Sequence, residues 1–223
     1  MATVLAGTLI GALLGGRLSE GLQQRVLAGL GLVTLVLGVD YALAWRETNP
    51  LIVLGGVLIG GIAGEAIGIE RRLEALGDAI QRRVGGAGST VSEAFFTASL
   101  LFCVGPLAVV GSIQDGLTGD YSALATKALL DGFAAIALAS TLGWGVGLAA
   151  ITVLVLQGAL ALGAGAFAPL LRGEALAALT SAGGILIIGI SLRLLDVRDV
   201  KVGNFLPALV AAPALVGLVA ALS

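Results

Sequence analysis

The sequence predicts an all-α membrane protein, a polytopic helical bundle of about eight spans that forms a single membrane domain over residues 1–223. Two features of its composition indicate this fold class: 58% of the residues are hydrophobic and only 12% are charged. A soluble domain carries roughly 25% charged residues. The mean hydropathy of +1.07 agrees, and the apolar residues fall into runs close to the ~20 residues that cross a bilayer.

The apolar runs give the expected spans in chain order. They lie at residues 2–16, 26–45, 50–64, 94–113, 122–142, 146–168, 174–194 and 205–222. The first run lacks a basic region ahead of it, so we expect a retained span rather than a signal peptide.

Two of these runs carry glycines at every fourth position, at Gly7, Gly11 and Gly15 and at Gly56, Gly60, Gly64 and, just beyond the second of these runs, Gly68. Such a ridge lets another backbone approach closely. Helix packing is therefore the expected role, and a pore-lining face is the alternative.

Residues 66–90 form the one long polar stretch, which we expect to be a cytoplasmic interfacial helix followed by a linker. Its apolar residues share one helical face, while arginines and acids cover the rest. These apolar positions are Ile69, Leu73, Leu76, Ile80 and Val84, and the expected flexible joint is at Gly85, Gly86 and Gly88. Membrane anchoring is the expected role, and recruitment of a partner is the alternative.

The distribution of Lys and Arg predicts the orientation, because cytoplasmic loops are enriched in these residues. With eight spans, one side receives nine of the twelve: Arg17, Arg25, Arg71, Arg72, Arg82, Arg83, Arg193, Arg198 and Lys201. The other side receives Arg46 and Arg172. We therefore expect both termini to lie outside the cytoplasm.

The two ends of the chain resemble each other. Residues 30–44 align with 181–195, and each segment is followed by a polar loop, an Asn and a Pro-containing start to the next span. We predict inverted three-helix repeats at 1–64 and 146–223, an arrangement typical of secondary transporters. Residues 94–145 would hold two broken central spans.

The first predicted break is Gly105-Pro106, in the middle of a span. Proline lacks the amide donor and clashes with the preceding turn, so the helix should kink or break. Freed backbone groups can bind an ion where they face protein or water, and kinked packing without a ligand is the alternative. Neighbouring candidate site residues are Thr97, Ser99, Cys103, Val104 and Ser112, and the second predicted break is at Gly143, Gly145 and Gly147.

Lys127 and Asp131 lie one helical turn apart within a predicted span. An unpaired charge at bilayer depth costs roughly 2.5–3.5 kcal/mol on insertion scales, so both side chains should face the bundle interior. They form either a structural ion pair or a binding and coupling site. Asp115 and Asp120 belong either to a solvated turn or to a vestibule that attracts cations.

Several function classes are excluded or disfavoured. The chain has no histidine and one cysteine, which removes zinc sites built on these residues, intrachain disulfides and Ser-His or Cys-His catalysis. No metal or other cofactor is predicted, and the dispersed basic residues do not suggest nucleic-acid binding. An aspartyl protease dyad is disfavoured because the Gly-x-Gly-Asp pattern is absent. We expect no enzyme.

The central segment FCVGPLAVVGSIQDGLTGDYSALATKALLDG (102–132) carries a family resemblance. It is joined by GTLIGALLGGRL, ETNPLIVLGG, ASTLG and VGNFLPALVAAP. On these stretches the chain resembles the bacterial multi-pass membrane family catalogued as domain of unknown function 554. Leu107 stands where that family's pattern has a methionine. The resemblance implies a multi-pass protein of the bacterial inner membrane. The family is suspected of transport but has no settled activity, and the resemblance implies no substrate.

The expected function is a transporter or channel for a small solute, most simply a small cation. Asp131 would bind the ion or a coupling proton, Lys127 would set its ionisation, and the backbone at Val104–Pro106 would supply ligands. Asp115 and Asp120 would enrich cations at the outer mouth. The expected partners are the lipid bilayer, the solute and a second copy packed through a glycine ridge. The alternative is a membrane scaffold or regulator with a structural ion pair.

Overall fold

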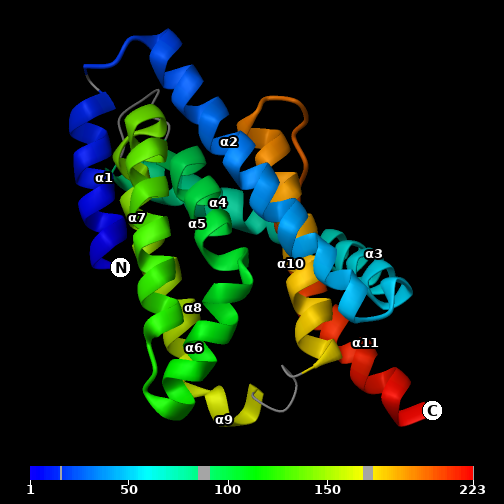
Figure 1. Cartoon of the computed structure of the whole chain (residues 1–223). Coiled ribbons are helices and arrows are strands. Elements are labelled where there is room, and N and C mark those ends of the chain that lie inside the picture. Colours follow the sequence, from blue (N-terminus) through cyan, green and yellow to red (C-terminus); the bar gives the residue numbers. More distant parts are fainter. Residues whose placement is uncertain (16, 85–90, 168–172, 223) are drawn as a thin grey trace.

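The computed structural model describes residues 1–15, 17–84, 91–167 and 173–222, and in these ranges the chain forms helices and no strand (Figure 1). This confirms the predicted all-α fold class. The α-helices are α1 Ala2–Gly15, α2 Glu20–Ala42, α3 Pro50–Ile67, α4 Ile69–Val84, α5 Val91–Val104, α6 Pro106–Thr118, α7 Ser122–Leu142, α8 Ala149–Leu162, α9 Ala164–Phe167, α10 Glu174–Leu194 and α11 Ala208–Leu222. Short 3-10 helices are η1 Leu43–Glu47, η2 Trp144–Leu148 and η4 Val202–Phe205.

Six helical segments in the described residues are long and apolar enough to cross a membrane. They are Glu20–Glu47, Pro50–Ile67, Ser122–Leu142, Trp144–Leu162, Glu174–Leu194 and Val202–Leu222. A seventh span would consist of α5 and α6, which are bent by 59° at their junction. Helix α1 has 14 residues and is only about 21 Å long. The count of eight spans therefore remains a prediction.

The glycine ridge of α1 packs on α7. A Cβ atom at Gly11 would overlap the carbonyl oxygen of Ile136, and one at Gly15 would lie 2.6 Å from that of Ser140. The ridge of α3 packs on α11 and η4 in the same way, with a Cβ at Gly56 only 2.6 Å from Cα of Ala212. Helix packing is thus the confirmed role of both ridges. Because the chain's own helices cover them, a dimer would need another surface, and the oligomeric state remains a prediction.

Helix α10 is the central helix of the bundle, and 67% of the residues in its most apolar 18-residue stretch are buried. It crosses α2 closely because Gly38 and Gly184 meet there: a Cβ at Gly38 would lie 2.9 Å from the amide nitrogen of Ile188. Near the same crossing, the hydroxyl of Ser181 donates to the carbonyl of Ala42 at 2.8 Å. This crossing fixes α2 beside α10 and leaves its other side turned towards α5 and α7 (Figure 1).

The second predicted break, at Gly143, Gly145 and Gly147, does not interrupt a span in the structure. Helix α7 ends at Leu142, and η2 leads directly into α8. Gly143, with φ 84°, therefore belongs to the connection between two spans and does not interrupt one. Of the two predicted breaks, only that between α5 and α6 falls within a span. The packing of α2 on α10 and of α3 on α11 does not establish the inverted repeats, which remain a prediction.

Within the polar segment 66–90, helix α3 continues to Ile67, Gly68 ends it with φ 69°, and α4 runs from Ile69 to Val84. The glycine joint predicted at Gly85, Gly86 and Gly88 lies outside the described residues, as does Arg172. The turn between α1 and α2 and the loop after α10 lie at the same end of the bundle (Figure 1). Both segments are among those that the charge count assigns to the basic side.

The ridge on α3 gives a direct test of this packing. Gly64→Ala should lower the free energy of unfolding by about 1–3 kcal/mol, the usual effect of overpacking, because the new methyl group would overlap the carbonyl oxygen of Asn204. The measurement is thermal unfolding of the purified protein in detergent.

Gly55→Ala on the same helix is the matched control. Its Cβ would meet only a side-chain methyl of Leu215, at 3.4 Å, and alanine is the better helix former by about 1 kcal/mol. Equal destabilisation by the two substitutions would contradict this assignment of the α3 faces.

Candidate functional site

The break between α5 and α6 lies at the centre of the candidate site. Helix α5 ends at Val104 and α6 begins at Pro106, with Gly105 between them in an extended conformation, φ −68° and ψ 146°. The amide of Ala108 donates to the carbonyl of Gly105 at 3.0 Å and closes the first turn of α6. Pro106 cannot donate to the carbonyl of Phe102, which would be its partner in a continuous helix.

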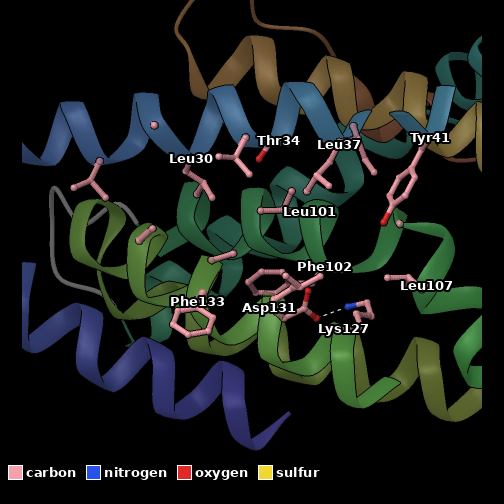
Figure 2. A pocket seen from close by; sticks show the side chains of 18 residues that line it. Leu30, Thr34, Leu37, Tyr41, Leu101, Phe102, Leu107, Lys127, Asp131 and Phe133 are labelled. Atoms are coloured by element: carbon pink, nitrogen blue, oxygen red, sulfur yellow. Dashed lines mark hydrogen bonds and ion pairs between the residues drawn. The ribbon is translucent and has the colours of Figure 1, made fainter. Parts of the chain in front are cut away.

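A partly open cavity of about 340 Å³ lies beside this break, between α2, α5 and α7 (Figure 2). This volume is within the range of ligand pockets, roughly 300–1,000 Å³. Its wall is formed by Val26, Gly29, Leu30, Val33, Thr34, Leu37, Tyr41, Leu101, Phe102, Gly105, Leu107, Lys127, Leu130, Asp131, Phe133, Ala134, Ala137 and Ile187. A Cβ at Gly105 would meet no atom within 4 Å, so open space adjoins the break.

Lys127 and Asp131 are the charged residues of this wall. The ammonium group of Lys127 donates to Oδ2 of Asp131, and the two side chains are only 7% and 13% exposed. They point towards each other beside Phe102 and Leu107 (Figure 2). The structure therefore brings the acid, the base and the helix break to one cavity.

Helix α2 contributes one long wall that the sequence analysis missed. Its lining residues Val26, Leu30, Thr34, Leu37 and Tyr41 recur every three or four positions, which places them on one face of the helix. Leu37 and Tyr41 point down towards α5 (Figure 2). The spacing was available in the sequence, but α2 is apolar on most sides, so this stripe did not stand out from its lipid-facing neighbours.

The other polar candidates on α5 and α6 lie outside the cavity wall. Thr97 is buried, and the hydroxyl of Ser99 is 3.1 Å from that of Thr152 on α8. The hydroxyl of Ser112 donates to the carbonyl of Ala108 at 2.6 Å. The hydroxyl groups of Ser99 and Ser112 thus make contacts between and within helices.

Val104 and Cys103 pack in the core instead of lining the cavity. The side chain of Val104 is buried in the main hydrophobic cluster, and Cys103, which is partly buried, packs against that cluster. Their side chains therefore contribute to packing around the break and not to the cavity wall.

Asp115 and Asp120 also lie away from the cavity. The carboxylate of Asp120 is exposed and accepts hydrogen bonds from the amide of Ser122 at 3.0 Å and from Nε2 of Gln114 at 2.7 Å. The Ser122 amide in particular holds the pKa of Asp120 below its usual value. Asp115 is on α6, and its carbonyl accepts from Gly119, whose φ of 72° ends the helix. Both aspartates thus take part in the turn between α6 and α7.

A second cluster of polar groups, centred on Glu70, was not predicted. Glu70 is only 2% exposed. Its Oε2 accepts from the amide of Gly203 at 2.6 Å, its own amide donates to Oδ1 of Asn204 at 2.8 Å, and Arg193 lies 3.7 Å from Oε1. Burial raises the pKa of Glu70, while the Gly203 amide and the charge of Arg193 oppose this rise.

These contacts fix the amphipathic helix α4 to the rest of the bundle. The amide group of Asn204 also donates to Oε2 of Glu65 at the end of α3. The guanidinium of Arg193 lies 5.0 Å from the ring centroid of Phe96 on α5, within cation–π distance. The carboxylate of Glu70 thus meets Asn204 and Arg193, which both lie more than a hundred residues further along the chain. Local sequence patterns therefore did not reveal this anchor.

Within the described residues, no group of three or more His, Cys, Asp or Glu side chains is arranged to hold a metal ion. What the cavity offers is one ammonium group, one carboxylate, the polar groups of Thr34 and Tyr41, and an apolar surface. This set can bind charged groups by exchange of ion-pair partners.

Comparisons with known proteins give relatives without an established activity. The sequence profile of a family described as "Protein of unknown function (DUF554)" matches residues 1–217. The chain is 30% identical to the "Uncharacterized membrane protein YdfK" of Bacillus subtilis over 215 residues, 96% of this chain and 91% of the relative. It is 31% identical to the "Uncharacterized protein YqgA" of Escherichia coli over 217 residues, 95% of this chain and 91% of the relative. No solved structure matches.

The ion pair gives a stability prediction. Asp131→Asn should destabilise the fold by about 3 kcal/mol because it leaves the Lys127 ammonium without its partner in a largely buried position. The double variant Lys127→Met with Asp131→Leu should unfold near the wild-type temperature, since apolar replacement of a buried pair is often neutral. Thermal unfolding in detergent measures both. A double variant as unstable as the single one would contradict mutual neutralisation as the structural role of the pair.

The raised pKa of Glu70 predicts a pH dependence. The folded state holds this proton more tightly than the unfolded state, so the stabilisation is complete below the ordinary glutamate pKa, about 4.3. It is lost as the pH rises through the raised value. The unfolding temperature should therefore fall over this pH window.

In Glu70→Gln that part of the pH dependence should be absent, because the amide does not titrate. Glu74→Gln is the matched control, since Glu74 lies on the same helix and pairs with Lys201 at 3.8 Å near the surface. Identical pH profiles for wild type and Glu70→Gln would show that Glu70 does not titrate in this window.

Proposed function

The chain belongs to the DUF554 family of membrane proteins, and from this premise we propose that it transports a small solute across the bacterial inner membrane. The solute is bound in the cavity between α2, α5 and α7, most simply through a small cation or cationic group at Asp131. The proposal extends to the orientation expected from the charge count, with both termini outside, to a homo-oligomeric assembly, and to transport rather than catalysis.

The observation that carries the proposal is that the ion pair and the broken helix adjoin the same cavity. A pair that served only assembly would be enclosed by packed side chains. Here Lys127, Asp131 and Gly105 all line a space of about 340 Å³. Charges and non-helical backbone at membrane depth occur where they border protein or a water-filled cavity, and they commonly mark substrate pathways.

The proposed binding step is an exchange of partners. In the empty site the Lys127 ammonium neutralises Asp131. An incoming cationic group takes the place of the ammonium beside the carboxylate. The carbonyl of Phe102, to which Pro106 cannot donate, is the proposed second ligand. Lys127 thereby makes occupation reversible, because it competes for the same carboxylate. The bend between α5 and α6 provides a joint about which one side of the cavity could move.

The test is a flux screen with protein reconstituted in liposomes. Wild-type protein should move at least one solute from a panel of small cations, amines, amino acids and carboxylates, and Asp131→Asn should lower that flux at least tenfold because it removes the charge that binds the cationic group. Asp120→Asn is the matched control, since Asp120 is exposed in the turn before α7, and it should retain most of the flux.

Two results would contradict the proposal at different points. If wild-type protein moves nothing in the panel, transport is wrong and the scaffold alternative is favoured. If Asp131→Asn moves the solute as fast as wild type does, transport stands but this cavity is not its site.

A further inference from the structure

The ion pair limits the charge that a ligand of the cavity can carry. Lys127 and Asp131 line the same cavity, and each is the other's counter-ion. A ligand with one positive charge that binds Asp131 leaves Lys127 unpaired, and a ligand with one negative charge that binds Lys127 leaves Asp131 unpaired. Both situations are unfavourable in a poorly hydrated site. A ligand with one charge of each sign replaces one ion pair by two, and the net charge of the site stays the same.

The spacing of the two residues along α7 suits such a ligand. They project from positions one helical turn apart on α7, about 6 Å along the axis, and both side chains meet at the cavity wall (Figure 2). A short zwitterion can therefore enter between them without a change in the backbone of α7. This requires only that the lysine and aspartate side chains separate, which their flexible carbon chains permit.

The rest of the wall indicates an apolar body on the same ligand. Around the pair lie Leu30, Leu37, Leu101, Phe102, Leu107 and Phe133, and polar atoms contribute only a small part of the surface (Figure 2). A bare metal ion would leave this apolar space unused. An apolar group of several carbons would gain affinity from each methylene that it removes from water.

We propose that the solute is a small zwitterion with an apolar body, of the chemical class of the apolar α-amino acids, whose ammonium group binds Asp131 while its carboxylate binds Lys127. This inference rests on the proposed function and specifies its substrate. The cationic group that displaces Lys127 from Asp131 is then supplied together with the anion that Lys127 needs.

The experiment compares four probes that separate the contributions of the ammonium group, the carboxylate and the apolar body to binding. Leucine carries both charges and the apolar body, 3-methylbutylamine lacks the carboxylate, 4-methylpentanoate lacks the ammonium group, and glycine lacks the body. Binding to purified wild-type protein in lipid nanodiscs is measured by calorimetry. Leucine should bind at least tenfold more tightly than each of the other three.

The single variants should reverse this selectivity, a result that a purely structural pair would not give. In Lys127→Met the amine should bind at least as tightly as leucine, because Asp131 is left to be neutralised. In Asp131→Asn, 4-methylpentanoate should bind at least as tightly as leucine. The double variant Lys127→Met with Asp131→Leu should bind none of the charged probes, while its unfolding temperature reports that it is folded.

The results that would contradict this inference differ from those that would contradict the proposed transport. If the amine binds wild-type protein as tightly as leucine does, or if no probe binds, the zwitterion is wrong. A flux screen in which wild-type protein still moves another solute, with the loss in Asp131→Asn, would leave the proposed function standing. If that screen shows no flux at all, both the proposed transport and the zwitterionic solute are wrong.

Discussion

The pairing of Lys127 with Asp131 is the constraint around which the central bundle is arranged. Each charge alone would oppose placing α7 among apolar helices, at roughly 2.5–3.5 kcal/mol on insertion scales. Because they lie one turn apart, they neutralise each other without help from another helix. The wall opposite them is therefore free to be apolar, and the break at Gly105 opens on the same space.

The shape of the cavity follows from where small residues occur. On α1 and α3, glycine ridges allow close packing on α7 and α11, so little space remains between those helices. Helix α2 instead presents Leu30, Leu37 and Tyr41 towards α5 and α7 (Figure 2). The glycine crossing at Gly38 and Gly184 ties α2 to α10 on its other side. The cavity lies on the side of α2 that faces α5 and α7.

Charged groups outside this cavity serve anchoring. The Glu70 cluster attaches α4 to α10 and η4 through a buried carboxylate, a backbone amide and Arg193. Asp120 stabilises the turn before α7 by accepting the amide of Ser122. Charged groups therefore have two roles in the described residues. Those of Glu70, Arg193 and Asp120 hold segments together, whereas the Lys127–Asp131 pair lines the cavity proposed to hold a ligand.

The sequence by itself determined the membrane class, most of the helices and the placement of Lys127 and Asp131 one helical turn apart. The reason is that these depend on local properties, namely apolar length, glycine spacing, a proline without an amide donor and the i,i+4 separation. The limits of α7 and α10 match their predicted ranges for this reason. The tertiary structure alone decided that α2 forms the cavity wall, that Thr97, Ser112 and Asp120 lie elsewhere, and that Glu70 meets Asn204 across the chain. Such contacts depend on which uniform apolar face turns towards which neighbour, and helices apolar on nearly every side carry no local signal of that choice.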